Sequence, residues 1–239
     1  MIQFVAETGS TNADLIARIE TGEPVREGDW LVAERQIAGR GRQGRTWFDG
    51  HGNFMGSTVV RTGPQDPPPQ SLALVTGVAV YDAVSHFCPD NCSLMLKWPN
   101  DLLLQEAKLS GILLERVGDV VVAGIGMNLA IAPQLPDRAT IALSALGPVP
   151  SPGEFASKLA QSLNAELERW RHYGLDPLIR RWLAVATPLG TNLCVHEPDG
   201  AILAGQFAGL DPHGSLLLRL ANGETRAIHA GDVFMTDKD

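Results

Sequence analysis

A glycine-studded run of arginines is the segment of the chain best suited to chemistry. Arg40, Arg42 and Arg45 stand within Gly39–Trp47, with glycines between them. Glycine lets a backbone approach a ligand closely, and a guanidinium group stays protonated and forks around carboxylate or phosphate oxygens. Neighbouring guanidinium groups repel one another unless an anion lies among them, so the spacing predicts a flap that closes over an anionic ligand. The alternative is a solvated surface loop with a chance cluster of arginines.

A second polar cluster is predicted at the turn Lys97–Asp101, which reads KWPND. Pro99 disfavours helical geometry at Trp98, so the lysine leaves its strand as the chain turns. The turn would offer an ammonium group, a flat apolar ring, an amide and a carboxylate to one ligand. An ordinary Pro-Asn-Asp turn with a buried tryptophan is the alternative.

Two later segments carry weaker signals. Lys108 begins the strand-like segment Lys108–Leu113, where Gly111 would permit close approach of a ligand, although a lysine at a strand start is usually a solvated edge residue. Gly124–Asn128 is not a dinucleotide fingerprint, because a third glycine and a following helix are missing. Its glycines would let a ligand lie against the backbone, and Asn128 could form a hydrogen bond with it.

Ser10 and Thr11 precede a helix-forming pattern near the start of the chain. Thr11 and Asp14 have the spacing of a capping box, with aspartate in place of the usual glutamate. Helix capping alone would explain these residues.

The sequence contains neither a G-x-S-x-G elbow nor a Walker A loop, and its six histidines show no paired spacing. The pattern therefore favours chemistry that handles anions without a protein nucleophile. Activation of a carboxylate by a nucleotide fits this condition, because the substrate carboxylate itself attacks the α-phosphate. The protein then has to neutralise and align two anions that repel each other.

The elements that position these residues follow from apolar periodicity. Helical spacing or capping signals predict helices over residues 10–22, 70–87, 151–170 and 177–186. Short apolar runs between turn signals predict strands over residues 2–5, 30–33, 53–61, 94–97, 102–104, 108–116 and 120–127. This pattern is expected of an antiparallel or mixed sheet with helices.

The last fifty or so residues change character. Short strands are predicted over residues 193–195, 201–208, 215–220 and 225–228, with hairpin turns at Asp199-Gly200, His213-Gly214 and Asn222-Gly223. Their spacing indicates a small barrel-like β domain. We expect one domain over residues 1–187 and a second over residues 188–239.

The bulk composition excludes several classes of protein. A formal net charge of −8 argues against general nucleic-acid binding. The chain has neither an apolar run of about 18 residues nor a secretory signal. Its three cysteines are too few for a disulfide framework. We expect a cytoplasmic protein that binds neither DNA nor membranes.

Taken together, the chain resembles biotin–protein ligases, also called biotin–[acetyl-CoA-carboxylase] ligases, over almost its whole length. The Gly39–Trp47 loop, KWPND, KLSGIL at 108–113 and GIGMN at 124–128 occur in the order of that family. The resemblance implies an α+β fold, with a mixed β-sheet and helices on one side. This class II aminoacyl-tRNA synthetase-like catalytic domain would be followed by a small SH3-like β-barrel. Because Ser10 lies so near the start, the resemblance implies the monofunctional form without an N-terminal DNA-binding domain.

The resemblance also implies a reaction in two steps. Biotin and ATP, with Mg2+, would give biotinyl-5′-AMP and pyrophosphate. A specific lysine of a biotin carboxyl carrier protein would then attack the adenylate. The chain would act as a monomer or a homodimer.

The site residues implied by the resemblance fall into overlapping groups. Arg42 and Lys108 would be catalytic. The residues implied for biotin are Ser10, Thr11, Gln36, Gly39, Arg40, Arg42, Lys108 and Gly111. Those implied for ATP or the adenylate are Arg40, Arg42, Arg45, Trp47, Asn100, Lys108 and Asn128. Asp101 would meet the metal through Mg-ATP, or would position the incoming lysine together with Asn100.

Two alternatives stay open from the sequence. A lipoate–protein ligase shares the fold and the adenylation chemistry, but it is expected to have a different glycine-rich signature. A non-catalytic biotin-binding module could retain the fold and release no pyrophosphate.

Overall fold

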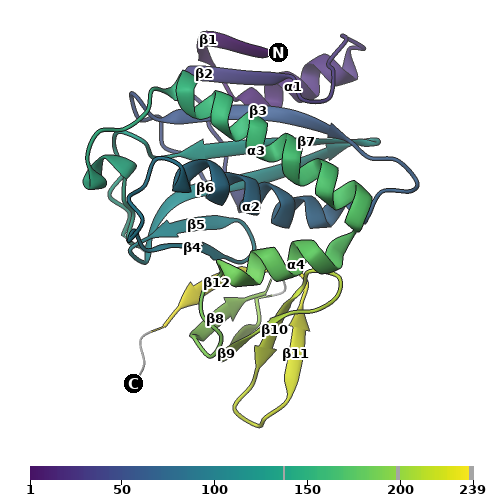
Figure 1. The fold of residues 1–239 in the computed structure, drawn as a ribbon, viewed down its shortest axis with the longest axis vertical. Coiled ribbons are helices and arrows are strands. Elements are labelled where there is room, and N and C mark those ends of the chain that lie inside the picture. Colours follow the sequence, from purple (N-terminus) through teal and green to yellow (C-terminus); the bar gives the residue numbers. More distant parts are fainter. Residues whose placement is uncertain (137, 198–199, 237–239) are drawn as a thin grey trace.

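A mixed β-sheet is the frame of the larger part of the molecule (Figure 1). The computed structural model describes residues 1–136, 138–197 and 200–236. Within these residues, the sheet order is β1-β2-β3-β7-β6-β5-β4. Strand β1 runs parallel to β2, whereas the other neighbours pair in an antiparallel manner. The predicted mixed sheet is therefore confirmed.

The predicted helices and strands of this part are all present, with bounds that differ by a few residues. The strands are β1 (Ile2–Thr8), β2 (Trp30–Gln36), β3 (Phe54–Arg61), β4 (Leu94–Lys97), β5 (Asp101–Leu104), β6 (Ala107–Val117) and β7 (Val120–Met127). The α-helices are α1 (Thr11–Glu20), α2 (Leu72–Ser85), α3 (Pro152–Tyr173) and α4 (Leu175–Ala184). Three short 3-10 helices are η1 (Arg42–Gly44), η2 (Pro69–Ser71) and η3 (Leu143–Leu146).

Helices cover both faces of the sheet, so the expectation of helices on one side is corrected. Helices α2 and α3 pack on one face, as Figure 1 shows, and belong to the main core. On the opposite face, Leu15 of α1 packs in a separate cluster with Leu31, Val59 and Val122. The strands can serve two cores because successive side chains point to opposite faces.

The C-terminal strands form a second, antiparallel sheet below the first (Figure 1). Its order is β11-β10-β9-β8-β12 within the described residues, which confirms the predicted small β domain. The strands are β8 (Asn192–His196), β9 (Ile202–Leu210), β10 (Leu216–Arg219), β11 (Thr225–Ile228) and β12 (Asp232–Met235). Strand β12 was not predicted; it pairs with β8, which lies far from it in the sequence.

The two sheets share one apolar core. Trp182 of α4 meets Phe207 of β9 with ring centroids 6.5 Å apart. The turns at Gly214 and Gly223 are confirmed by positive φ angles of 86° at both glycines. Asp199 of the third predicted turn lies outside the described residues. The division at residue 188 stays a prediction.

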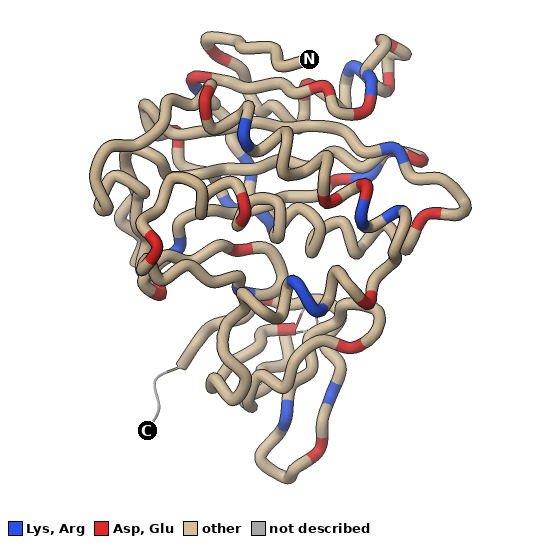
Figure 2. Tube along the Cα trace, viewed as in Figure 1, with Lys and Arg blue, Asp and Glu red and all other residues tan. Residues whose placement is uncertain are grey.

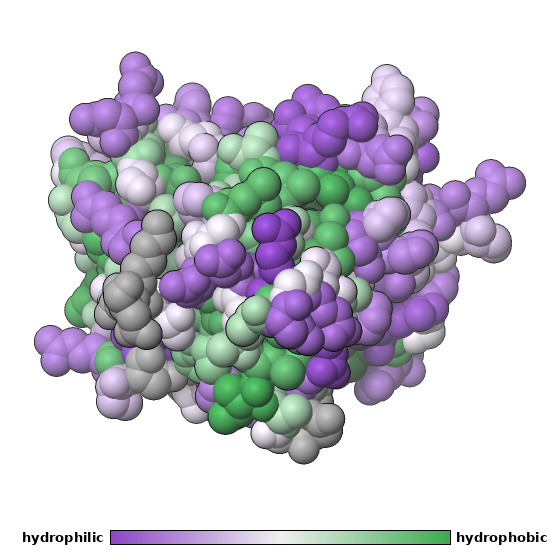
Figure 3. Space-filling view, turned by 90° about the horizontal axis from the view of Figure 1, so that it is seen from below, coloured by the Kyte–Doolittle hydropathy of each residue, from purple (hydrophilic) through white to green (hydrophobic). Residues whose placement is uncertain are grey.

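Charge and hydropathy are distributed without strong segregation. Lysines and arginines are interspersed with acidic residues along the trace in Figure 2. Seen from below, apolar side chains gather in the middle of the face, with hydrophilic ones around and among them (Figure 3). In the described residues, none of the helices combines the length and apolar character needed to cross a membrane.

The substitution Ser71→Ala should lower the free energy of unfolding by about 1–3 kcal/mol. The Trp170 indole N–H donates to Ser71 Oγ at 2.8 Å, and both residues are buried. Alanine leaves that N–H without a partner in a place that water does not reach. Urea denaturation would measure the change. Ser157→Ala is the control, since that exposed hydroxyl bonds the carbonyl of Gly153 within α3. Equal midpoints for the two variants would contradict the prediction.

Candidate active site

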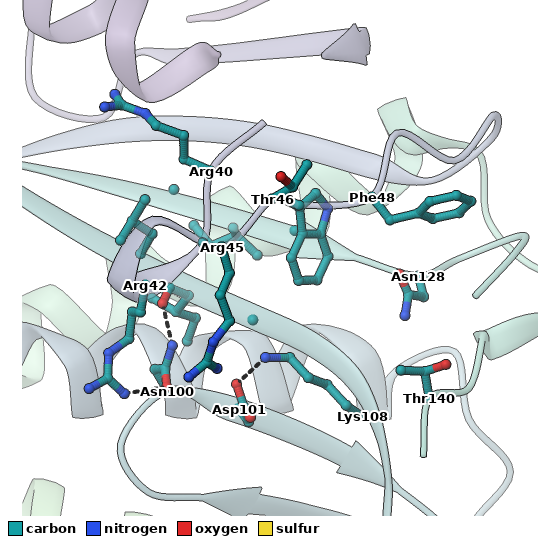
Figure 4. A pocket seen from close by; sticks show the side chains of 18 of the residues that line it. Arg40, Arg42, Arg45, Thr46, Phe48, Asn100, Asp101, Lys108, Asn128 and Thr140 are labelled. Atoms are coloured by element: carbon teal, nitrogen blue, oxygen red, sulfur yellow. Dashed lines mark hydrogen bonds and ion pairs between the residues drawn. The ribbon is translucent and has the colours of Figure 1, made fainter. Parts of the chain in front are cut away.

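A cavity of about 370 Å³ lies between the start of α1, the Gly39–Trp47 loop and strands β6 and β7. The residues predicted for the site that line it are Ser10, Thr11, Gln36, Arg40, Arg42, Arg45, Trp47, Asn100, Asp101, Lys108, Gly111 and Asn128. Gly39 is the exception and lies behind the wall, where an added Cβ would come 3.2 Å from Gln36 Nε2. Residues from position 10 to position 128 thus meet at one cavity, and Figure 4 shows part of its lining.

Strand β7 shows why the sequence GIGMN belongs at this site. Ile125 and Met127 point into the main core, and the glycines that alternate with them face the cavity. A Cβ on Gly126 would overlap the ring of Trp47, and one on Gly124 would overlap the amide of Asn12. The prediction left this space to a ligand, whereas the structure fills it with these two side chains. Because both side chains lie against the glycines of the strand and line the cavity, they form its floor.

The Gly39–Trp47 loop is a small hairpin rather than an open flap. Trp47 N donates to Gly39 O at 2.9 Å, and Gly41 N donates to Arg45 O at 2.7 Å. Gln43 at its tip has a φ of 56°, in the left-handed region. These backbone bonds fix where the arginine side chains leave the loop.

Two of the arginines reach toward the KWPND turn and the C-terminal sheet. Arg42 donates from Nη1 to Asn100 Oδ1 at 3.0 Å and from Nη2 to Gly231 O at 3.1 Å. Arg45 forms an ion pair with Asp232 at the start of β12. Burial lowers the pKa of the Arg42 guanidinium, while the charge of Asp101 opposes that shift. Arginine nevertheless stays protonated, because its ordinary pKa is so high.

Arg40 points away from the other two arginines, as Figure 4 shows. Its Nη2 lies 3.6 Å from Glu115 Oε1 on β6. The three guanidinium groups therefore have partners on three different elements, and these partners relieve the repulsion that the sequence led us to assign to a bound anion.

Asp101 is shared by two lysines at the centre of the site. Its Oδ1 lies 2.6 Å from Lys108 Nζ, and its Oδ2 lies 3.8 Å from Lys97 Nζ. Burial lowers the pKa of the Lys97 ammonium group, with Asp101 raising it and the neighbouring cations, Lys108 first, lowering it further. Lys108 is not the solvated edge lysine of the alternative reading, since only 18% of its side chain is exposed. One carboxylate facing several cations leaves a positive potential that would stabilise an anion.

Three buried polar atoms in the described residues lack a hydrogen-bond partner, and all three belong to side chains that line this cavity. They are Trp47 Nε1, Asp101 Oδ1 and Asn128 Oδ1. The close Lys108 contact satisfies the charge of Asp101 Oδ1 but not its hydrogen-bond geometry. Most buried polar groups in proteins are hydrogen-bonded, so unpaired ones gathered at a cavity indicate where a polar ligand binds.

The start of α1 differs from the predicted capping box by one residue. Ser10 is the N-cap, and its side chain accepts from Ala13 N at 3.5 Å. Asp14 accepts from the Thr8 hydroxyl instead of reaching back to Thr11. Thr11 is consequently free to bond Gln36, with Thr11 N donating to Gln36 Oε1 at 2.7 Å.

Several lining residues escaped the sequence analysis. They include Ser57 and Thr140 on the wall, and Asp232 and Phe234 from β12. A buried serine within the apolar strand β3 is a signal that could have revealed Ser57. Asp232 gave no such signal, because it pairs with Arg45 in the folded structure but lies far from it in the sequence.

Comparison with known proteins agrees with this geometry. A model described as Biotin/lipoate A/B protein ligase family matches residues 10–131. A second, described as Biotin protein ligase C terminal domain, matches residues 192–236. The chain is 37% identical over 238 residues to a biotin--[acetyl-CoA-carboxylase] ligase of Mycobacterium tuberculosis, covering 97% of this chain and 88% of that protein. The chain belongs to the biotin protein ligase family.

Other relatives of this ligase agree in sequence and in fold. A biotin--[acetyl-CoA-carboxylase] ligase of Paracoccus denitrificans is 36% identical, covering 97% of this chain and 99% of that protein. The biotin protein ligase from Aquifex aeolicus in complex with biotin and ATP superposes with a TM-score of 0.85 at 25% identity, covering 98% of this chain and 99% of that one. The predicted fold class is therefore confirmed.

The substitution Gly126→Ala should displace the Trp47 indole from the floor of the cavity, because the new methyl group would occupy the position of the ring. The other four tryptophans, Trp30, Trp98, Trp170 and Trp182, are buried. Acrylamide quenching of fluorescence therefore reports mainly on Trp47, and we expect it to increase. Overpacking should also cost about 1–3 kcal/mol of stability.

Gly153→Ala is the control for this experiment. A Cβ at Gly153 would make an ordinary contact, 3.6 Å from Phe4 Cζ. Identical quenching of the two variants would show that Trp47 does not depend on Gly126.

Proposed function

We propose that this protein is an ATP-dependent ligase that activates biotin as biotinyl-5′-AMP and transfers it to a lysine of a biotin carboxyl carrier protein. The observation that carries the proposal is the polarity of the cavity. One part offers neutral hydrogen-bonding groups from Ser10, Thr11 and Gln36, and another holds the cations of Arg42 and Lys108. A ligand with a polar neutral head and a carboxylate tail complements this arrangement. The names of the relatives support the same substrates.

The first step joins two anions, and the cations of the site make that possible. The biotin carboxylate oxygen would attack the α-phosphorus of ATP, and the bond to the β-phosphate oxygen would break to release pyrophosphate. Lys108 and Arg42 would neutralise the carboxylate and the α-phosphate, lowering their repulsion as they meet. Both cations are held by neighbours, Asp101 and Asn100, so little reorganisation is needed.

In the second step, the neutral amine of the carrier lysine would attack the carbonyl carbon of the mixed anhydride. An amide bond forms, AMP leaves with the electrons of the broken carbon–oxygen bond, and the attacking nitrogen loses one proton to water. Asn100 acts here through Arg42, because its Oδ1 accepts from Arg42 while its Nδ2 donates to Ile112 O at 2.7 Å. Asn100 is therefore a positioning residue in this proposal.

The adenosine end is assigned to Trp47 and Asn128. The unpaired Asn128 Oδ1 can accept from an exocyclic amino group, and Asn128 Nδ2 is already held by Ile141 O at 3.2 Å. The Trp47 ring offers a flat apolar face, with Lys108 Nζ 5.9 Å from its centroid. Gly111 and Arg45 line the cavity, and Gly39 would support its wall from behind, next to Gln36. Arg40 would join the ligand if it left Glu115.

The side chains present do not by themselves fit a magnesium ion. Both oxygens of Asp101 face lysine ammonium groups. The described residues contain no cluster of three or more His, Cys, Asp or Glu side chains that could hold a metal. An ion that arrives with ATP would take its ligands mainly from phosphate oxygens and water. The further expectations of a cytoplasmic monomer or homodimer that binds no DNA stay predictions.

The proposal is tested by incubating the protein with ATP, labelled biotin and a biotin carboxyl carrier domain. We expect biotin-dependent release of pyrophosphate and label on one carrier lysine. Lipoate in place of biotin should give neither product. Lipoate-dependent turnover without biotin-dependent turnover would favour the lipoate ligase, and biotin binding without pyrophosphate would favour the non-catalytic module.

Lys108→Ala should lower the rate of biotin-dependent pyrophosphate release by about 100- to 1,000-fold at saturating ATP, the size of effect seen when one preorganised charge contact is lost. The matched control is Lys158→Ala, which removes a lysine of α3 outside the cavity. A normal rate in Lys108→Ala would remove this residue from the mechanism.

Arg42→Gly should loosen retention of the adenylate, because it removes the bonds to Asn100 and Gly231 together with one cation. Activated biotin would then escape and label bystander proteins, which a blot for biotin can detect. Arg116→Gly is the control, since that exposed guanidinium bonds its own hairpin at Gly118 O. Unchanged selectivity for the carrier in Arg42→Gly would refute the retention role.

A further inference from the structure

Glu115 ends a hydrogen-bonded chain that runs beneath the neutral part of the cavity. Its Oε2 accepts from Asn12 Nδ2 at 2.8 Å. Ser57 Oγ donates to Asn12 Oδ1 at 2.6 Å, and Ser57 Oγ lies 2.6 Å from Thr11 Oγ1. Asn12, Ser57 and Thr11 are all at least nine-tenths buried and line the cavity. The mechanism above gives no role to Glu115, Asn12 or Ser57.

The charge of Glu115 fixes the orientation of the Asn12 amide. An ionised carboxylate only accepts hydrogen bonds, and the other oxygen of this carboxylate, Oε1, lies 3.6 Å from Arg40 Nη2. Asn12 must therefore turn its NH2 group toward Glu115 and its carbonyl oxygen toward Ser57. Without the carboxylate, only the longer bond from Asn12 Nδ2 to Leu113 O, at 3.4 Å, would oppose an exchange of the two ends of the amide, which have nearly the same shape.

This orientation then fixes the direction of the two hydroxyl bonds. Asn12 Oδ1 cannot donate, so the single proton of the Ser57 hydroxyl goes to it. Ser57 Oγ can then only accept in its contact with Thr11, so the proton of the Thr11 hydroxyl points to Ser57. The longer contact of Thr11 Oγ1 with Gln36 Oε1, at 3.1 Å, takes at most a share of that proton. Gln36 Oε1 keeps the Thr11 backbone N–H, so the Gln36 amide NH2 stays available as a donor. The wall thus presents lone pairs from two hydroxyls and N–H groups from one amide.

We infer that Glu115 is a positioning residue that sets the hydrogen-bond polarity of the head-group pocket through Asn12. A cyclic urea has two N–H donors and one carbonyl acceptor, which complements two hydroxyl acceptors and one amide donor. The inference rests on the proposed function, because biotin carries such a urea. It adds that selectivity for the urea depends on a carboxylate that does not contact it.

An exchange of the amide and the carboxylate tests this inference. Asn12→Asp alone places two carboxylates together and should weaken biotin binding by at least about tenfold, as expected for a buried polar group left unpaired. In the double variant Asn12→Asp/Glu115→Gln, the new glutamine can donate to the new aspartate, which can still accept from Ser57. The polarity is then restored, and we expect affinity to return to within about threefold of wild type.

Glu115→Met removes the acceptor at similar length and should raise the Kd and KM for biotin by about tenfold, with little change in the KM for ATP. Titration calorimetry measures Kd, steady-state kinetics separates KM from kcat, and thermal unfolding reports stability. Glu34→Gln, at an exposed position of β2 outside the cavity, is the matched control.

The outcomes are distinct. Restored affinity in the double variant supports the inference even where a single variant folds poorly. A double variant that folds but binds as weakly as Asn12→Asp overturns it, as does wild-type affinity in Glu115→Met. If the wild-type protein does not bind biotin, the proposed function is overturned together with this inference. If the wild-type protein binds biotin and the variants contradict the expectations above, only this inference fails.

Discussion

The strict alternation of side chains along β6 and β7 is the constraint on which the rest of the structure depends. One face of these strands must fill the core beneath α2 and α3, and it carries residues such as Ile112, Ile125 and Met127. The opposite face has to leave room for a cavity, and there Gly111, Gly124 and Gly126 stand. Since the period of a strand is two residues, one short sequence serves both needs. A shift of register by one residue would place the glycines in the core and close the cavity.

The cavity so formed concentrates cations in one part and ordered hydrogen bonds in the other. The C-terminal sheet takes part in the charged half, because it contributes Asp232 to Arg45 and a backbone carbonyl to Arg42. In the neutral half, the hydrogen bonds set one another's directions, since each hydroxyl has only one proton to give. The two halves meet at the arginine hairpin, where Arg40 turns to Glu115. In the proposed function, the hairpin would connect recognition of the head group with retention of the charged tail.

Local sequence determined most of the elements and many of the site residues. Apolar periodicity predicted the helices and the longer strands, since burial of one face follows directly from spacing. The motifs that hold Arg42, Asp101 and Lys108 were readable because the residue types that bind anions occur there in short, ordered segments. Gly124 and Gly126 were likewise recognisable as positions where another group can approach the backbone closely. The sequence did not show that Asn12 and Trp47 are the side chains that do so.

Only the tertiary structure decided which groups face one another. Helix α1 covers the second face of the sheet, Asp232 meets Arg45, and Glu115 meets both Arg40 and Asn12. These partners lie far apart in the sequence, and each is a polar or charged residue of a type that is common on protein surfaces. The sequence alone determined the elements and the short motifs that hold the arginines and lysines of the cavity, because both depend on neighbours within a few residues. The pairing of charges and the polarity of the pocket depend on distances that exist only once the sheets and helices have packed.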